Sequence, residues 1–130
     1  QALMPLMGEE FASVLFACAQ GDIKNAPKLT FKPQCSVCLV AASQGYPESP
    51  QKGKKISISV ETNSSLQVFH AGTTTDEFDN IITSGGRVLS IVAQGESFDK
   101  AFDLAYCSLK GIKFNGMQFR KDIGYQVRNI

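Results

Sequence analysis

The sequence predicts an α+β fold, in which a small and mostly antiparallel β domain carries one packed helix. Short apolar runs typical of strands recur between residues 36 and 93, separated by glycine, proline or acidic turns. A helical period of apolar residues follows the serine at position 97. The chain has 130 residues, of which 43% are hydrophobic, so it is long enough to bury one core.

Composition limits the classes of partner. The formal net charge is only +1, whereas a nucleic-acid-binding domain needs a clear excess of basic residues. No apolar run approaches the roughly 18 residues of a membrane span, and residues 1–7 lack the basic start of a secretory signal. We therefore expect a cytoplasmic protein with no nucleic-acid and no membrane partner. The basic clusters are interpreted as solvated loops; they comprise Lys52, Lys54, Lys55, Arg120 and Lys121.

A first amphipathic helix is predicted from Leu3 to Ala19. Apolar residues recur there at intervals of three and four over about four turns. Pro5 suits a first turn, and Gly21 is placed to end the helix. Residues 22–33 are polar and contain two prolines, which indicates a linker. We therefore divide the chain into residues 1–34 and a domain of residues 35–130. The apolar stripe consists of Leu3, Leu6 or Met7, Phe11, Val14, Leu15 and Cys18.

The strands are expected after this linker. Residues 36–43 form an apolar run, and residues 56–60 alternate between apolar and polar, which is typical of a strand with one buried face. Residues 66–70 form another short strand, followed by an acidic turn at residues 76–80. Two further apolar runs flank a double glycine, at residues 81–83 and 87–93.

A second helix is expected after Ser97, which is suited to the N-cap. Gly111 marks its end, and residues 117–125 are interpreted as a final strand and turn. Its apolar stripe consists of Ala101, Phe102, Ala105, Leu109 and Ile112.

The stretch Gly85-Gly86-Arg87 is the first candidate site. Two glycines allow a turn with positive φ that exposes backbone N–H groups. The arginine adds a planar fork of donors that suits a pair of phosphate oxygens. The alternative is a simple hairpin turn with an exposed arginine.

Two further loops have a functional and a structural interpretation. Gly45, Tyr46 and Pro47 form either a ligand-facing loop or a tight turn with a packing tyrosine. Arg120 and Asp122 either orient an anion or form an internal ion pair.

The remaining chemically distinctive residues favour structural roles. Cys35 and Cys38 have the spacing of a metal or redox pair, but no second pair completes a zinc site, and alternation along a strand separates them. Free thiols in a reducing compartment are expected. His70 is the only histidine and has no neighbouring nucleophile pattern. Lys100 lies in a tripeptide like that of lipoyl domains, but within a helical period instead of a hairpin tip.

Seven blocks taken together, in this order and spacing, resemble the C-terminal end of the phosphoribosylamine–glycine ligase family, also called glycinamide ribonucleotide synthetases. The resemblance covers essentially the whole chain, and the order of the blocks is more specific than any one of them. They are residues 36–43, Gly45-Tyr46-Pro47, Lys52-Gly53, residues 68–73, residues 85–89, Gly116-Met117 and residues 120–124.

The resemblance implies an ATP-grasp ligase of de novo purine synthesis. In that family ATP phosphorylates the carboxylate of glycine, and the amine of 5-phosphoribosylamine displaces phosphate to give glycinamide ribonucleotide. Residues 1–34 would then include the last helix of the ATP-grasp domain. The complete enzyme would use ATP and magnesium or manganese, whereas this chain would bind none of them alone and would contain no catalytic residue and no metal ligand. Its partners would be the N-terminal and ATP-grasp domains and the two small-molecule substrates.

The resemblance also implies roles for the three candidate loops. Arg87 and the backbone of Gly85 and Gly86 would hold the substrate 5-phosphate. Gly45, Tyr46 and Pro47 would line the cleft, and Arg120 and Asp122 would brace the loop or approach the substrate. These residues would position and neutralise the substrate, without making or breaking bonds.

The sequence departs from the family pattern at several points. Ser84 stands where an asparagine is usual, residues 74–81 differ, and Cys35 has no counterpart. The ATP-grasp Arg-Phe-Gly-Asp-Pro-Glu signature would lie before Gln1 and is not in this chain. The alternatives are the C-terminal domain of another ATP-grasp ligase, such as a biotin-dependent carboxylase, and a non-enzymatic carrier or interaction module.

Overall fold

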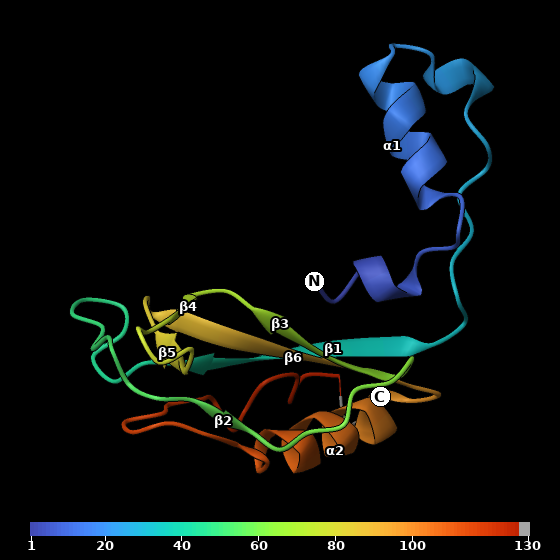
Figure 1. Cartoon of the computed structure of the whole chain (residues 1–130). Helices are drawn as coiled ribbons and strands as arrows, with labels where there is room; N and C mark the ends of the chain where they lie inside the picture. The colour runs from blue at the N-terminus through green and yellow to red at the C-terminus, as the bar shows by residue number, and fades with distance from the viewer. Residues whose placement is uncertain (128–130) are drawn as a thin grey trace.

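The computed structural model describes residues 1–127 and contains two α-helices, two short 3-10 helices and seven strands (Figure 1). The predicted domain of residues 35–130 therefore ends in three residues that lie outside the described part. The helices are η1 (Met4–Leu6), α1 (Phe11–Ala19), η2 (Ile23–Asn25) and α2 (Phe98–Leu109). The strands are β1 (Cys35–Ala42), β2 (Ser57–Ile58), β3 (Leu66–His70), β4 (Thr73–Thr75), β5 (Ile81–Thr83), β6 (Arg87–Gly95) and β7 (Ile112–Lys113).

The strands form three antiparallel sheets, as the sequence predicts. The central sheet has the order β1-β6-β3, and β2-β7 and β4-β5 are separate two-stranded pairs. Ile91 on β6 lies opposite Leu39 on β1 and Val68 on β3. The strand β6 is the central strand of this sheet, and its residues from 88 to 94 are all buried.

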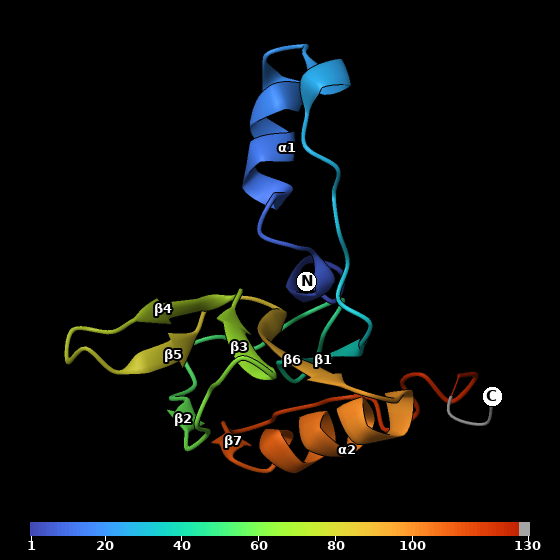
Figure 2. The same ribbon diagram turned by 90° about the vertical axis from the view of Figure 1, so that its right-hand side faces the viewer.

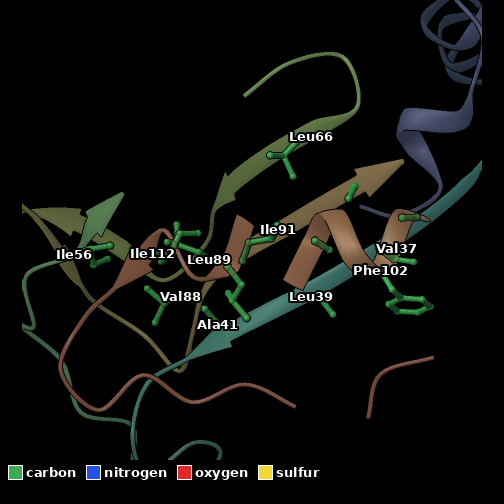
Figure 3. Packing of buried hydrophobic residues seen from close by; sticks show 14 of the residues in the cluster. Val37, Leu39, Ala41, Ile56, Leu66, Val88, Leu89, Ile91, Phe102 and Ile112 are labelled. Atoms are coloured by element: carbon green, nitrogen blue, oxygen red, sulfur yellow. The ribbon is translucent and has the colours of Figure 1, made fainter. Parts of the chain in front are cut away.

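One face of the central sheet packs against α2 and forms the core (Figure 3). Side chains of a strand alternate between its faces, so every second residue of β1 and β6 reaches this core. The sheet contributes Val37, Leu39, Ala41, Leu89, Ile91 and Ala93, and the helix contributes Ala101, Phe102, Ala105 and Leu109. Ile112, the last member of the predicted helical stripe, is also buried but belongs to β7.

The predicted start of α2 is confirmed. The Ser97 hydroxyl accepts a hydrogen bond from the backbone N–H of Lys100 at 3.3 Å, which satisfies one of the free donors of the first turn. The helix ends at Leu109, shortly before Gly111.

The prediction of one continuous helix from Leu3 to Ala19 is wrong. The segment splits into η1 and α1, because its middle pairs with a distant segment. Lys32 donates its N–H to Leu6 O at 2.8 Å, and Gly8 donates its N–H to Thr30 O at 2.8 Å. These bonds hold Met7 in an extended conformation, with φ −75° and ψ 145°.

Two predicted strands are also shorter than expected. Of residues 56–60, only Ser57–Ile58 forms a strand. Of residues 117–125, only Gln118 pairs, through two bonds of 2.7 and 2.8 Å with Ala42. The following chain turns at Gly124, with φ +72°, where a Cβ would lie 1.9 Å from the ring of Phe102. The tail therefore bends over α2 instead of continuing along β1.

Residues 1–34 extend away from this body. Figures 1 and 2 show α1 standing clear of the sheet, while η1 lies close to it. No residue of α1 is buried, and Leu15 and Phe16 are 52% and 64% exposed. The assignment of residues 1–34 to a separate domain remains a prediction. Among the described helices, none combines the length and apolarity that crossing a membrane requires.

Candidate functional site

The Gly85-Gly86 loop joins two different sheets. It leads from β5, which pairs with β4, to β6, which pairs with β1 and β3. The alternative of a simple hairpin is therefore wrong, although Arg87 is exposed as that alternative implied. Arg87 is the first residue of β6, so the rigid central strand sets the position of its backbone.

The two glycines serve close packing instead of a left-handed turn. Neither has a positive φ, which corrects the expected conformation. A Cβ on Gly86 would lie 2.3 Å from Cδ2 of Tyr46, and one on Gly85 would lie 3.3 Å from Cα of Gly72. The missing side chain of Gly86 therefore lets the Tyr46 ring pack directly on the backbone beside Arg87.

Hydrogen bonds hold the loop by its carbonyl groups. The Ser43 hydroxyl donates to Gly85 O at 2.9 Å, and the Ser43 N–H donates to Gly86 O at 2.8 Å. Ser43 is almost completely buried, so these two hydrogen bonds anchor the loop to the interior of the domain. Within residues 1–127, the N–H groups of Gly85 and Gly86 donate to no other group. They remain available as donors to a ligand, which is the arrangement an anion site needs.

The second candidate loop meets the first. Gly45 has φ +83° and accepts a hydrogen bond from the Ser49 N–H at 2.8 Å, which closes a tight turn. The turn carries Tyr46 against Gly86, and the Tyr46–Pro47 peptide bond is cis. The expectation of a tight turn with a packing tyrosine is confirmed, and that tyrosine also lines two pockets.

One pocket brings together side chains from all three candidate loops. Its volume is about 520 Å³, and Tyr46, Arg87 and Arg120 all contribute to its wall. The floor comes from Val40 and Ala42, which lie on the sheet face opposite α2. We call this hollow the arginine pocket.

A second pocket of about 600 Å³ lies beside the arginine pocket. Val40, Tyr46 and Arg87 line both, while Gly72 and Gly86 line the second one alone. Arg87 therefore stands at the boundary between the two hollows. In the described part of the chain it forms no ion pair, so its positive charge has no carboxylate partner there.

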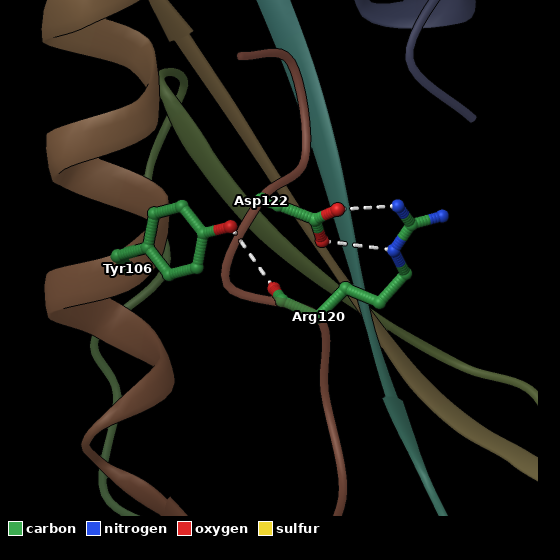
Figure 4. A network of polar contacts seen from close by, with 3 residues as sticks. All are labelled: Tyr106, Arg120 and Asp122. Carbon is green, nitrogen blue, oxygen red and sulfur yellow. Dashed lines mark hydrogen bonds and ion pairs between the residues drawn. The ribbon is translucent and has the colours of Figure 1, made fainter.

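Arg120 differs from Arg87, because its charge is already paired (Figure 4). Its Nε donates to Oδ1 of Asp122 at 2.9 Å and its Nη2 to Oδ2 at 2.5 Å, a two-point contact that suits the planar guanidinium. The internal ion pair is thus present. The hydrogen bonds lower the pKa of Asp122 and raise that of Arg120. The Tyr106 hydroxyl donates to Arg120 O at 3.0 Å, which ties the backbone of this segment to α2.

The other chemically distinctive residues form no cluster of metal ligands within residues 1–127, although Cys38 lines the arginine pocket. Cys35 and Cys38 lie on β1, and the four cysteines are free thiols. Burial raises the pKa of Cys38. His70 ends β3, where its Nδ1 lies 3.0 Å from the Thr73 hydroxyl. Lys100 lies in α2 and pairs with Glu96. Among residues 1–127, no three His, Cys, Asp or Glu side chains gather to hold a metal ion.

The fold and the pockets define a small α+β domain with exposed donors suited to an anionic ligand. The family model described as "Phosphoribosylglycinamide synthetase, C domain" matches residues 36–126, and the chain belongs to this family.

Curated relatives include the phosphoribosylamine–glycine ligase of a Nostoc species, which is 37% identical over 99% of this chain and 31% of its own length. The ligase of Caldanaerobacter subterraneus is 41% identical over 95% of the chain and 29% of its own length. The trifunctional purine biosynthetic protein adenosine-3 of Chironomus tentans is 42% identical over the whole chain but only 10% of its own length. The chain thus spans about a third or less of these relatives.

A solved structure supports the same grouping. The crystal structure of phosphoribosylamine–glycine ligase from Thermotoga maritima is similar to this chain with a TM-score of 0.76 and 29% sequence identity. The similarity covers 88% of this chain and 27% of the other. The chain therefore has the mixed helix and antiparallel sheet fold of the C-terminal domain of these ligases.

Proposed function

We propose that this chain is the C-terminal part of an ATP-dependent ligase of purine biosynthesis, which joins glycine to 5-phosphoribosylamine. The products are glycinamide ribonucleotide, ADP and phosphate. The names of the relatives and the family match over residues 36–126 support this proposal. The partners of the chain would be the N-terminal and ATP-grasp domains, and the location would be the cytoplasm.

Within this ligase, the arginine pocket would form part of the wall that holds the phosphoribosyl substrate. The unpaired charge of Arg87 is the observation that carries this role, since a buried or paired arginine would be less available to a phosphate. Arg87 also lines the neighbouring pocket, which Gly86 lines too, so the N–H groups of Gly86 and of the adjoining Gly85 would supply two further donors on that side of Arg87. Preorganised donors of this kind orient a substrate without taking part in bond formation.

The other two loops would shape the same site. Gly45, Tyr46 and Pro47 would form one wall of the cleft, because the Tyr46 ring is fixed against Gly86. Arg120 would be held in place by Asp122, which accepts hydrogen bonds from two of the five guanidinium N–H groups. Arg120 is therefore a bracing residue in this proposal, and Arg87 is the one that contacts phosphate.

ATP and its metal ion would be held elsewhere. The described residues do not fit a magnesium or manganese site, because they contain no cluster of three potential ligands. We therefore derive no step of phosphoryl transfer from this chain. Residues 1–34 would form the C-terminal end of the ATP-grasp domain and the linker, and the exposed apolar residues of α1 would pack against the rest of that domain.

The test is to replace Arg87 in the complete ligase. A charge-assisted contact to phosphate is worth about 1.5–3 kcal/mol, so Arg87→Ala should raise the KM for 5-phosphoribosylamine about tenfold to a hundredfold. The KM values for glycine and ATP should stay unchanged. Lys52→Ala removes a positive charge from an exposed loop position and serves as the matched control. An unchanged KM for 5-phosphoribosylamine in Arg87→Ala would refute the assignment.

A further inference from the structure

A third hollow meets the arginine pocket at Phe119 and lies between the C-terminal half of α2 and the tail. It has a volume of about 610 Å³, and its apolar wall includes Tyr106, Met117 and Phe119. Three exposed lysines surround this wall, Lys110, Lys113 and Lys121. We call this hollow the lysine groove.

The lysine groove carries uncompensated positive charge. Its three lysines form no ion pair within the described residues. The groove adjoins the site proposed above, because Phe119 lines both hollows, whereas Arg120 lines only the arginine pocket and Lys121 only the groove. An occupant should therefore combine an apolar side chain with neighbouring negative charges.

The chain itself displays a segment with this chemistry, at the turn between β4 and β5. Phe78 is 75% exposed, the largest exposure among the large hydrophobic residues of the described part. Three acidic residues surround it, Asp76, Glu77 and Asp79. A phenyl ring flanked by carboxylates is complementary in polarity and charge to an apolar groove flanked by three lysines. We call this turn the acidic hairpin.

The acidic hairpin is ordered without a partner. Asp76 Oδ1 accepts hydrogen bonds from the N–H groups of Phe78 and Asn80, both at 2.9 Å. The backbone adds a bond from Asp79 N–H to Asp76 O at 3.1 Å. The turn therefore fixes the backbone around an exposed ring, which lowers the entropy cost of docking it.

Within one molecule the two surfaces lie apart. Figure 2 shows β4 and β5 projecting to the left beyond the central sheet, whereas α2 and β7 lie below it. Phe78 does not belong to the hydrophobic cluster that includes Tyr106 and Met117. A contact between the acidic hairpin and the lysine groove therefore requires two molecules.

We propose that the acidic hairpin of one copy of this chain docks into the lysine groove of a second copy. Phe78 supplies the apolar anchor, and Glu77 and Asp79 lie against the lysines. The hairpin and the groove are different surfaces of one copy. Two copies related by a two-fold axis would therefore form this contact twice, and copies related in another way would form a chain of such contacts. The proposal concerns association between chains and does not depend on substrate binding.

The first test measures self-association of the full chain by sedimentation velocity and by concentration-dependent amide shifts in NMR. Phe78→Ala should weaken self-association on the order of 30-fold, as expected for a central aromatic anchor. Added salt should also weaken it, since screening reduces the attraction between exposed charges. The matched control is Phe16→Ala, which removes a ring of 64% exposure from α1 and should leave the shifts at Lys113 and Lys121 unchanged.

The second test mixes two variants that each retain one half of the contact. Phe78→Ala keeps the groove, and the triple variant Lys110→Glu, Lys113→Glu, Lys121→Glu keeps the hairpin. Each alone should associate much more weakly than the unaltered chain, whereas their mixture should form a complex in which the groove shifts appear only in Phe78→Ala. The proposal fails if the unaltered chain is monomeric at all concentrations, if Phe78→Ala associates as the unaltered chain does, or if the mixture shows no shifts. Because no substrate is present, these outcomes leave the proposed function untouched.

Discussion

The two α-helices of this chain are both rich in apolar residues, but only one of them buries those residues. In α2, Ala101, Phe102, Ala105 and Leu109 are buried against the central sheet. In α1, Ser13 is the only polar residue, yet no residue is buried and Phe16 is 64% exposed. An apolar pattern therefore indicates that a helix must pack against another surface, but it does not show which element or domain provides that surface.

The difference follows from how each helix joins the sheet. Only a short turn connects β6 to α2, so the helix packs back on the strand that precedes it. A long extended segment separates α1 from β1, and its hydrogen bonds run to residues 6–8 instead of to the sheet. We therefore expect the stability of the isolated chain to reside in residues 35–127, with α1 contributing little.

The largest effect on the free energy of unfolding is expected from a comparison of two leucines, one in the core and one in α1. Leu39→Ala removes a side chain that is 1% exposed at the centre of the core and should reduce the free energy of unfolding by about 3 kcal/mol. Leu15→Ala, in α1, should change it by less than about 0.5 kcal/mol. Denaturant unfolding followed by tyrosine fluorescence suits this comparison, because Tyr46, Tyr106 and Tyr125 all lie outside residues 1–34. Equal losses from both variants would mean that α1 and the core unfold as one unit.

A second, smaller effect comes from comparing two glycines with nearly the same backbone. Gly21 and Gly124 have φ +75° and +72°, so alanine is strained at both. A Cβ at Gly124 would also lie 1.9 Å from the Phe102 ring, whereas one at Gly21 would meet nothing within 4 Å. Gly124→Ala should therefore reduce the free energy of unfolding by about 2 kcal/mol. Gly21→Ala should leave the tyrosine-detected transition unchanged, and a loss there would contradict the independence of α1.

Where a structural feature depends on neighbouring residues, the sequence predicted it well. The strand at residues 66–70 and the N-cap at Ser97 are both found as predicted, and β1 differs from its predicted bounds by one residue. The end of α1 at Gly21 is also confirmed, because Gly21 and Asp22 donate their N–H groups to Cys18 O and Ala17 O at 3.1 and 2.9 Å. Each of these features rests on alternation, a cap or a turn within a few residues.

Features that depend on distant residues were missed. The break between η1 and α1 comes from pairing with residues 30–32, which no helical pattern reveals. The sequence predicts a turn with positive φ at the glycines beside Arg87, whereas the contact with Tyr46, some 40 positions earlier, explains the need for Gly86. The sequence also does not predict the role of Ser43, because a serine after an apolar strand gives no indication that its hydroxyl is buried and bonded to a distant loop. The chemistry of the residues predicts the three candidate loops, and the resemblance implies a shared substrate, but only the structure shows Tyr46, Arg87 and Arg120 around one pocket.

The smallest effect on stability is expected from the ion pair between Arg120 and Asp122, beside the arginine pocket. The pKa of Asp122 is lowered by its hydrogen bonds from Arg120, so the folded carboxyl ionises below its unfolded range near pH 4. A carboxyl with a lowered folded pKa stabilises the folded state above its unfolded pKa, and this contribution is lost as the pH falls through the folded pKa. Since both side chains are exposed, the loss should loosen the segment around Arg120 without unfolding the core. Carboxyl NMR titration should show the Asp122 midpoint rising in Arg120→Ala but staying in place in Lys121→Ala, and an unmoved midpoint in Arg120→Ala would mean that the pair does not hold this segment in solution.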